Sequence, residues 1–250
     1  MTPTLKKLLF FGVVLYLILL GAIIYERYRL LTNDQTASQT ESNPIQIDQG
    51  TPLPQEATPQ EETLPESVRM ETPFLSQAPF GIWDDLHQET CEEASLMMVH
   101  YFRQKKEFLS LQQANLELVD LVTWQSARGY KVDVAVAELA EIARGYYGLA
   151  TGRVIVDPTV DQIKKELAGG RPVIVPAAGR ELPNPYFTPP GPRYHMVVIK
   201  GYDAAGFIVN DPGTRRGKDF RYNYDDLMRA MHDWNQDDIN LGRKAVLVFD

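Results

Sequence analysis

Cysteine is almost absent from this 250-residue chain, whose single copy is Cys91. One cysteine excludes an intrachain disulfide framework and any zinc or iron–sulfur site built from several cysteines. Basic residues are a minority, because 25 lysines and arginines stand against 33 aspartates and glutamates. Nucleic-acid binding requires a basic surface, so we expect no nucleic-acid partner. The sequence also lacks a phosphate-binding glycine loop, a metal motif and an internal repeat, and we expect no cofactor.

Charge is missing altogether from residues Leu8 to Tyr25. As a helix these residues would span roughly 27 Å, close to the hydrocarbon thickness of a bilayer. No small-residue cleavage site follows them, so residues 1–30 are predicted to be an uncleaved transmembrane anchor. Lys6 and Lys7 favour an N-terminus on the inside of the cell membrane and a C-terminal domain on the extracytoplasmic side.

Aliphatic residues are scarce and aromatic residues absent in most of residues 31–69, which are rich in Gln, Thr, Glu, Pro and Ser. Such a composition cannot bury enough apolar surface to offset its ordering entropy, so this segment is predicted to be a disordered linker. Residues 70–250 are long enough for one domain with a sizeable core. The predicted organisation is therefore anchor, linker and domain.

Within the domain, helical periodicity comes first and strand patterns dominate later. Helices are predicted over Leu111–Trp124, over Asp133–Arg144 with Gly145 as a stop, from a Thr159 cap to Gly169, and over Asp225–Trp234. Strands are predicted over 154–156, 172–176, 195–199, 207–210, around 220–222 and over 245–249, and the pair 195–199 and 207–210 forms an antiparallel hairpin. This order predicts an α+β domain with a mainly antiparallel sheet.

Cys91 begins a further predicted helix, with Thr90 as the N-cap and Glu93 at the capping-box position. A helix N-terminus stabilises a thiolate by about 0.3–1 kcal/mol. Lowering the pKa of a thiol by about two units requires about 2.7 kcal/mol, and the charges of Glu92 and Glu93 oppose that shift. A nucleophilic Cys91 would therefore need an imidazole beside it, and the alternative is a small buried core residue.

Four histidines are candidates for that imidazole: His87, His100, His195 and His232. His195 opens an apolar strand directly after a long loop, where a side chain can face a cleft. Asp211 ends the strand predicted to pair with it. The hairpin is therefore expected to bring Asp211 beside His195, as the group that orients the base of a nucleophile–base–orienter triad.

Five blocks of sequence carry a resemblance to a known family: Thr72-Pro-Phe-Leu-Ser-Gln77, Cys91-Glu-Glu-Ala-Ser-Leu-Met-Met98, Gly170-Arg-Pro-Val-Ile-Val175, Tyr194-His-Met-Val-Val-Ile-Lys-Gly-Tyr-Asp203 and Asn210-Asp-Pro-Gly213. In this order they resemble the papain-like cysteine peptidases of the bacteriocin-leader (double-glycine) type, in the stand-alone peptidase-like branch. The resemblance covers about residues 70–250. It implies a papain-like fold and hydrolysis of peptide bonds in a peptide or protein substrate.

The resemblance also implies roles for individual residues. Cys91 matches the nucleophile, His195 the base and Asp211 the group that orients the histidine. Gln77 most closely matches the glutamine that stabilises the oxyanion, although it precedes Cys91 by fourteen positions rather than about six. Gln88 is closer in sequence and remains an alternative.

Two other functions stay open at this point. Glu92 and Glu93 beside the thiol, and the displaced glutamine, favour a catalytically inactive binding or scaffold module that keeps the papain-like fold. An acyl transferase could use the same triad with an amine in place of water. The reactivity of the Cys91 thiol distinguishes a binder from an enzyme, and product analysis with an added amine distinguishes transfer from hydrolysis.

Overall fold

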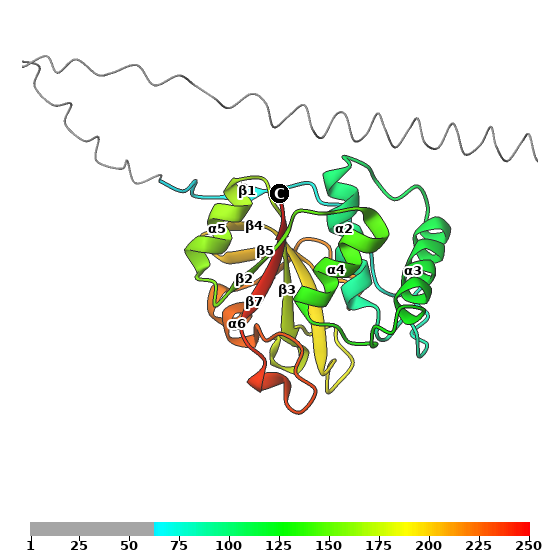
Figure 1. Ribbon diagram of the computed structural model, residues 1–250. Coiled ribbons are helices and arrows are strands. Elements are labelled where there is room, and N and C mark those ends of the chain that lie inside the picture. The colour runs from blue at the N-terminus through cyan, green and yellow to red at the C-terminus, as the bar shows by residue number, and fades with distance from the viewer. Residues whose placement is uncertain (1–62) are drawn as a thin grey trace, which may run out of the picture. The chain divides into compact units, whose positions relative to one another are not determined.

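The computed structural model describes residues 63–250 (Figure 1). The predicted anchor in residues 1–30, and all of the predicted linker before residue 63, lie outside the described residues. From residue 63 to residue 250 no helix combines the length and the apolar character that a membrane span requires.

The described residues form the α+β fold that the sequence predicts. The helices are α2 (Cys91–Arg103), α3 (Leu111–Ser126), α4 (Val136–Tyr147), α5 (Val160–Ala168) and α6 (Tyr224–Ala230). The strands are β1 (Val68–Arg69), β2 (Gly152–Val156), β3 (Val173–Ala178), β4 (Tyr194–Asp203), β5 (Gly206–Asn210), β6 (Phe220–Tyr222) and β7 (Ala245–Phe249).

The strands form one sheet in the order β2-β7-β3-β4-β5-β6, with β1 paired to the far end of β4. Every pairing in this sheet is antiparallel. The predicted hairpin is confirmed, because β4 and β5 pair directly, with Val198 opposite Asn210. The register shifts between Ile199 and Gly201, where β4 carries an irregularity typical of a β-bulge.

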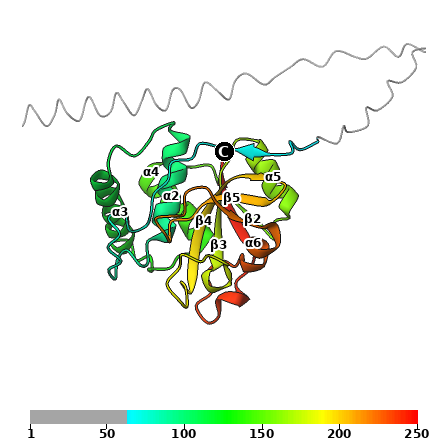
Figure 2. The same cartoon turned by 180° about the vertical axis from the view of Figure 1, so that it is seen from behind.

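Helices cover both faces of the sheet, with α2, α3 and α4 on one side and α5 and α6 on the other (Figures 1 and 2). Side chains of β4 alternate between the two faces, as the two-residue period of a strand requires. Met196 and Val198 belong to the core cluster under α2 and α4, whereas Val197 and Ile199 belong to the cluster under α5 and α6. The sheet is therefore buried on both faces.

Of the two capping boxes that the sequence predicts, one is present and one is not. Thr159 caps α5 with a full capping box, in which the Thr159 hydroxyl accepts from the Gln162 N–H and the Gln162 side-chain oxygen accepts from the Thr159 N–H. The capping box predicted for α2 is wrong. The Thr90 hydroxyl instead donates to the carbonyl of Gln77, and Glu93 is buried. Neither side chain therefore caps α2, because each makes tertiary contacts instead.

The predicted helix over Asp133–Arg144 also needs correction. Helix α4 begins at Val136, continues through Gly145 and ends before Gly148, which has the left-handed conformation of a helix stop. Gly145 is a packing residue, since a Cβ there would lie 2.6 Å from the Trp124 ring. The last helix is shorter than predicted, because α6 ends at Ala230.

Candidate active site

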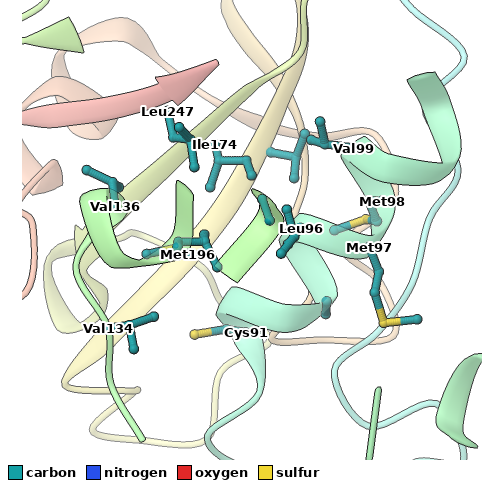
Figure 3. Close-up of a cluster of buried hydrophobic side chains, with 14 of the residues drawn as sticks. Cys91, Leu96, Met97, Met98, Val99, Val134, Val136, Ile174, Met196 and Leu247 are labelled. Atoms are coloured by element: carbon teal, nitrogen blue, oxygen red, sulfur yellow. The ribbon is translucent and has the colours of Figure 1, made fainter. Parts of the chain in front are cut away.

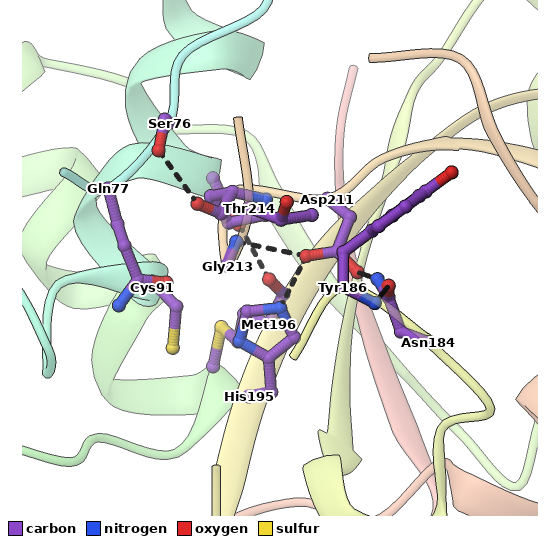
Figure 4. Close-up of polar contacts among 12 residues, drawn as sticks. Ser76, Gln77, Cys91, Asn184, Tyr186, His195, Met196, Asp211, Gly213 and Thr214 are labelled. Atoms are coloured by element: carbon purple, nitrogen blue, oxygen red, sulfur yellow. Dashed lines mark hydrogen bonds and ion pairs between the residues drawn. The ribbon is translucent and has the colours of Figure 1, made fainter. Parts of the chain in front are cut away.

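The four predicted site residues come from separate elements that meet at one end of the sheet (Figure 4). Cys91 is the first residue of α2, and His195 is the second residue of β4. Asp211 directly follows β5, and Gln77 lies in the extended segment before α2. Gln77 donates its backbone N–H to the carbonyl of Pro212, so the segment that carries it runs beside the Asp211 turn.

His195 and Asp211 form a buried pair. The His195 Nε2 lies 2.7 Å from the Asp211 Oδ1, and both side chains are almost fully buried, at 1% and 0% exposed. Three further donors hold the carboxylate: the Gly213 N–H at 2.9 Å, the Asn184 amide at 2.9 Å and the Tyr222 hydroxyl at 2.7 Å.

This environment fixes the charge of Asp211. Burial alone would raise the pKa of the carboxyl, but the His195 charge and hydrogen bond, together with the Tyr222 and Gly213 donors, outweigh it. The pKa of Asp211 is therefore held below its ordinary value of 3.8. An ionised aspartate on Nε2 fixes the tautomer and the plane of the imidazole.

Glycines make room for the imidazole. A Cβ at Gly213 would lie 2.7 Å from the His195 Cε1, and a Cβ at Gly179 would lie 3.1 Å from the His195 Cβ. Phe187 meets the ring edge-on, with 5.3 Å between the ring centres. The ring is thus held on several sides. His195 Nδ1 is left without a hydrogen-bond partner among residues 63–250, and His195 lines a cavity.

Gln77 is tied to the loop before α2. Its Nε2 donates to the carbonyls of His87 and Gln88, both at 2.9 Å, while its Oε1 is buried and has no partner among the described residues. In this arrangement both amide hydrogens are engaged by carbonyls. Gln88, the alternative oxyanion residue, is exposed and donates to the Trp83 carbonyl.

The Cys91 thiol is turned toward its own neighbour in the chain. The Cys91 Sγ donates to the Glu92 Oε2 at 3.0 Å, and the cysteine is 4% exposed. Figure 3 shows the sulfur directed toward Val134, within the core cluster that also contains Met196. Burial raises the pKa of this thiol well above its ordinary value, and the charge of Glu92 raises it further. The nearby backbone amide of Met196 acts in the opposite direction.

Two adjacent buried carboxyl groups surround the thiol. Glu92 and Glu93 are 1% and 2% exposed. Burial raises the pKa of Glu92 well above the ordinary range, and it raises the pKa of Glu93 to about 7. Glu92 also accepts the Val134 N–H at 3.4 Å. At neutral pH the pair therefore carries less than two full negative charges.

The structure brings together His195, Asp211 and the Gln77 segment, but it does not join the sulfur to the imidazole. Within residues 63–250 no hydrogen bond connects Cys91 Sγ with His195. Met196, which follows His195, contributes to the environment of the sulfur on the α2 side of the sheet. Turning the thiol away from Glu92 is the change that a Cys–His pair would require.

The other three histidines have partners of their own. His87 lies between Asp84 and Asn115, with its ring nitrogens 2.6 and 2.9 Å from their side-chain oxygens. His100 stacks on Tyr147, 3.8 Å between ring centres. His232 Nδ1 donates to the Gly242 carbonyl. In the described part of the chain, no cluster of three or more His, Cys, Asp or Glu side chains is arranged to hold a metal ion.

The sequence did not indicate which residues besides His195 form hydrogen bonds with Asp211. Asn184 lies in the long loop before β4, and its amide bridges Asp211 and the Tyr222 hydroxyl. Tyr222 lies on β6, at the edge of the sheet. Neither residue has a local signal, since both act only through contacts with residues far away in the sequence.

A cavity of about 960 Å³ opens over the imidazole. Gln77, Gln88 and His195 line it, together with the loop 186–193 and the turn 213–216. The cavity is large enough for several residues of an extended peptide.

Comparison with known proteins supports the likeness seen in the sequence. A family model described as the Peptidase_C39 like family matches residues 69–238. A chain from Bacillus anthracis, named as a candidate C39-like peptidase, has the same fold with a TM-score of 0.51 and 16% identity. That match covers 74% of this chain and 98% of the other. No curated protein matches the sequence.

Proposed function

The chain belongs to the Peptidase_C39 like family, and from this premise we propose that it is a cysteine peptidase with a Cys91–His195–Asp211 triad. The observation that carries the proposal is the buried His195–Asp211 pair, with its 2.7 Å contact and three further donors on the carboxylate. Such support for one imidazole is expected of a base that must keep one orientation while it gains and loses a proton.

The free ring nitrogen supports the assignment of His195 as the base. Asp211 occupies Nε2, which leaves Nδ1 as the nitrogen that takes a proton. Rotation about the Cα–Cβ bond of Cys91 would move the sulfur from Glu92 toward Nδ1. The resulting thiolate–imidazolium pair supplies the stabilisation that the α2 dipole alone cannot give.

The reaction then follows from the proposed roles. The Cys91 thiolate attacks the carbonyl carbon of a peptide bond, and the developing oxyanion takes a hydrogen bond from the Cys91 backbone N–H. The imidazolium protonates the leaving amine, and water deprotonated by His195 hydrolyses the thioester. Gln77 serves as the second oxyanion donor only if its amide releases the carbonyl of His87 or Gln88.

A thiol-reactive peptide probe tests this proposal. Covalent labelling of the full chain should disappear in Cys91→Ala and weaken strongly in Asp211→Asn, which removes the charge that stabilises the imidazolium. Peptide hydrolysis should fall in parallel. Labelling that persists in Cys91→Ala, or that is unchanged in Asp211→Asn at intact thermal stability, contradicts the triad.

The second candidate function is a catalytically inactive binding module. The contact between Cys91 and Glu92, and the raised pKa of the thiol, favour it. An inert thiol with a raised pKa would react with iodoacetamide more slowly than a free cysteine at every pH up to about 9, near the ordinary pKa of a thiol. Rapid alkylation at neutral pH that requires His195 would exclude this candidate.

We further propose that residues 1–30 attach the domain to the cell membrane, with the peptidase domain on the extracytoplasmic side. The support is the uncharged run Leu8–Tyr25 and the two lysines before it. The substrate would then be a peptide or protein outside the cytoplasm.

A further inference from the structure

The cavity over His195 carries an excess of positive charge in a protein that is acidic overall. The chain has a formal net charge of −8. The cavity is nevertheless lined by more arginines than acids, with Arg180, Arg193, Arg215 and Arg216 against Glu89 and Asp133. The positive charge is therefore concentrated where a substrate would enter.

The four cavity arginines have no carboxylate partner among the described residues, a feature that they share with Arg103, Arg128, Arg144 and Arg243 but not with five other arginines. Five arginines elsewhere in residues 63–250 pair with carboxylates: Arg69, Arg153, Arg171, Arg221 and Arg229. Within the same described range, none of the four cavity arginines forms a salt bridge. Arg193 donates to the backbone carbonyls of Gln236 and Asp237. The charge of Arg193 also lowers the pKa of Asp133, which burial raises to about 6.

Aromatic rings hold two of the guanidinium groups in place. The Arg216 guanidinium lies 5.0 Å from the centre of the Tyr186 ring, and that of Arg193 lies 5.5 Å from the centre of the Trp234 ring. A cation–π contact of this kind limits the movement of the guanidinium. Arg193 Nη2 donates to the two backbone carbonyls, so only its remaining N–H groups are available to an acceptor.

The arginines lie next to the residues that contact the imidazole. Arg215 is two positions after Gly213, which packs against the His195 ring. Arg180 directly follows Gly179, which packs against the His195 Cβ, and Arg193 precedes His195 by two positions. A peptide bond that reached His195 would thus have cationic side chains close by.

We propose that this site selects acidic peptides, with aspartate or glutamate side chains close to the bond that is attacked. The inference rests on the proposed peptidase function and adds the substrate class to it. A guanidinium binds a carboxylate through two parallel hydrogen bonds, and a cluster of arginines attracts anionic chains from solution. Because the arginines are exposed, they act on selectivity more than on total affinity.

Binding is tested separately from catalysis. Full-length Cys91→Ala is titrated with two fluorescent peptides that differ only by Glu and Asp in place of Gln and Asn. The acidic peptide should bind more tightly, by roughly tenfold at low ionic strength, and salt should reduce the difference. In Arg215→Gln/Arg216→Gln on the same background the preference should fall by about five- to tenfold.

Arg144→Gln/Arg243→Gln is the matched control, because both arginines are exposed and lie outside the cavity lining. It makes the same change of net charge and should keep the preference. A second double variant, Arg180→Gln/Arg216→Gln, leaves Arg215 in place and so shows whether a lost preference comes only from a local folding defect at Arg215. Equal binding of both peptides, or a preference that both double variants retain, overturns the proposal.

Hydrolysis of the same two peptides by the wild-type chain is the second measurement. If the acidic peptide binds preferentially but neither peptide is cleaved, the peptidase proposal fails and the acidic-ligand proposal stands. If both peptides are cleaved with the same kcat/KM and bound equally, the peptidase proposal stands and the acidic selectivity fails.

Discussion

Glu92 sets the state of the Cys91 thiol in this structure. Its carboxylate accepts the thiol hydrogen at 3.0 Å while its other oxygen accepts the Val134 N–H. A carboxylate in this position favours the neutral thiol, because a thiolate beside it would face a like charge in a buried environment. Burial and the charge of Glu92 therefore keep the sulfur protonated, and its hydrogen bond to Glu92 directs it toward that residue.

Replacing Glu92 by glutamine should make the thiol more acidic. Glu92→Gln removes a carboxyl whose ionised form raises the pKa of Cys91, and it leaves a side chain of similar size. At pH values where Glu92 is ionised, each unit of lowered thiol pKa increases the thiolate fraction, and hence the rate of iodoacetamide alkylation, by roughly tenfold. Glu141→Gln, an exposed change on α4, is the control and should leave the rate unchanged. An unchanged pH–rate curve for Glu92→Gln would contradict this role.

Glu93 makes the stability of the domain depend on pH. Its pKa is raised from 4.5 to about 7, so the native state binds a proton more tightly than the unfolded state does. This contribution is fully favourable below pH 4.5 and is lost as the pH rises toward 7. The loss is on the order of 3 kcal/mol.

Glu93→Gln should flatten this dependence. Denaturant unfolding of wild type should show a free energy of unfolding that falls between pH 5 and pH 7, and the variant should lose the part of that slope that Glu93 contributes. Glu92 and Asp133, whose pKa values are also raised, contribute the remainder. Asp211 acts in the opposite direction, since its lowered pKa gives stability that is lost only below pH 4. The pH range in which Glu93 affects stability therefore does not overlap with that of Asp211. An unchanged slope in Glu93→Gln would assign the pH dependence of stability to other groups.

At the scale of elements, the register of the β4–β5 hairpin places the charged pair. Asn210 lies opposite Val198, so the chain that follows β5 runs along β4 toward His195. A shift of one residue would send the side chain to the other face of the sheet. The irregularity between Ile199 and Gly201 fixes this register, and Gly201 allows β1 to approach, because a Cβ there would lie 2.2 Å from the Val68 oxygen.

The contact between α3 and α4 offers a test of packing at this scale. Alanine is favoured over glycine in a helix by about 1 kcal/mol. Gly145→Ala should nevertheless destabilise the domain by about 1–3 kcal/mol, since the new Cβ would lie 2.6 Å from the Trp124 ring. Denaturant unfolding measures the loss.

A second change checks the cause. In the Trp124→Phe background the smaller ring should relieve the overlap, so that Gly145→Ala becomes neutral or stabilising. Equal destabilisation in both backgrounds would place the cost in the helix backbone and contradict the packing explanation.

At the scale of the whole molecule, charge is separated between the surface and the site. The acidic chain repels other anions over most of its surface, while the arginines around His195 attract them to one cavity. An extracytoplasmic domain that is tethered to a membrane would meet its substrates by diffusion, and such focusing increases the rate of encounter.

The proposed anchor gives a prediction at the same scale. Full-length protein should sediment with membranes and resist extraction by high salt or carbonate, because a helix of 18 uncharged residues is held by apolar burial rather than by charge. A chain that lacks residues 1–30 should be recovered in the soluble fraction. Full-length protein that is released by salt would contradict the anchor.

The sequence by itself determined the α+β class, the antiparallel β4–β5 hairpin and most helix positions, because the periods of apolar residues are local properties. It also indicated that the turn after β5 would bring Asp211 to His195. The prediction was wrong for the capping box of Thr90 and Glu93 and for the helix stop at Gly145. In each case contacts with residues far away in the sequence outweigh the local preference.

Only the tertiary structure decided how the site is supported. Asn184 and Tyr222 donate hydrogen bonds to Asp211 from elements far apart in the sequence. The Glu92 carboxyl accepts a hydrogen bond from the Cys91 thiol because both groups are buried together. The arginines of two separate loops meet around one cavity. Burial and side-chain direction depend on contacts between distant residues, and no local pattern in a single sequence records them.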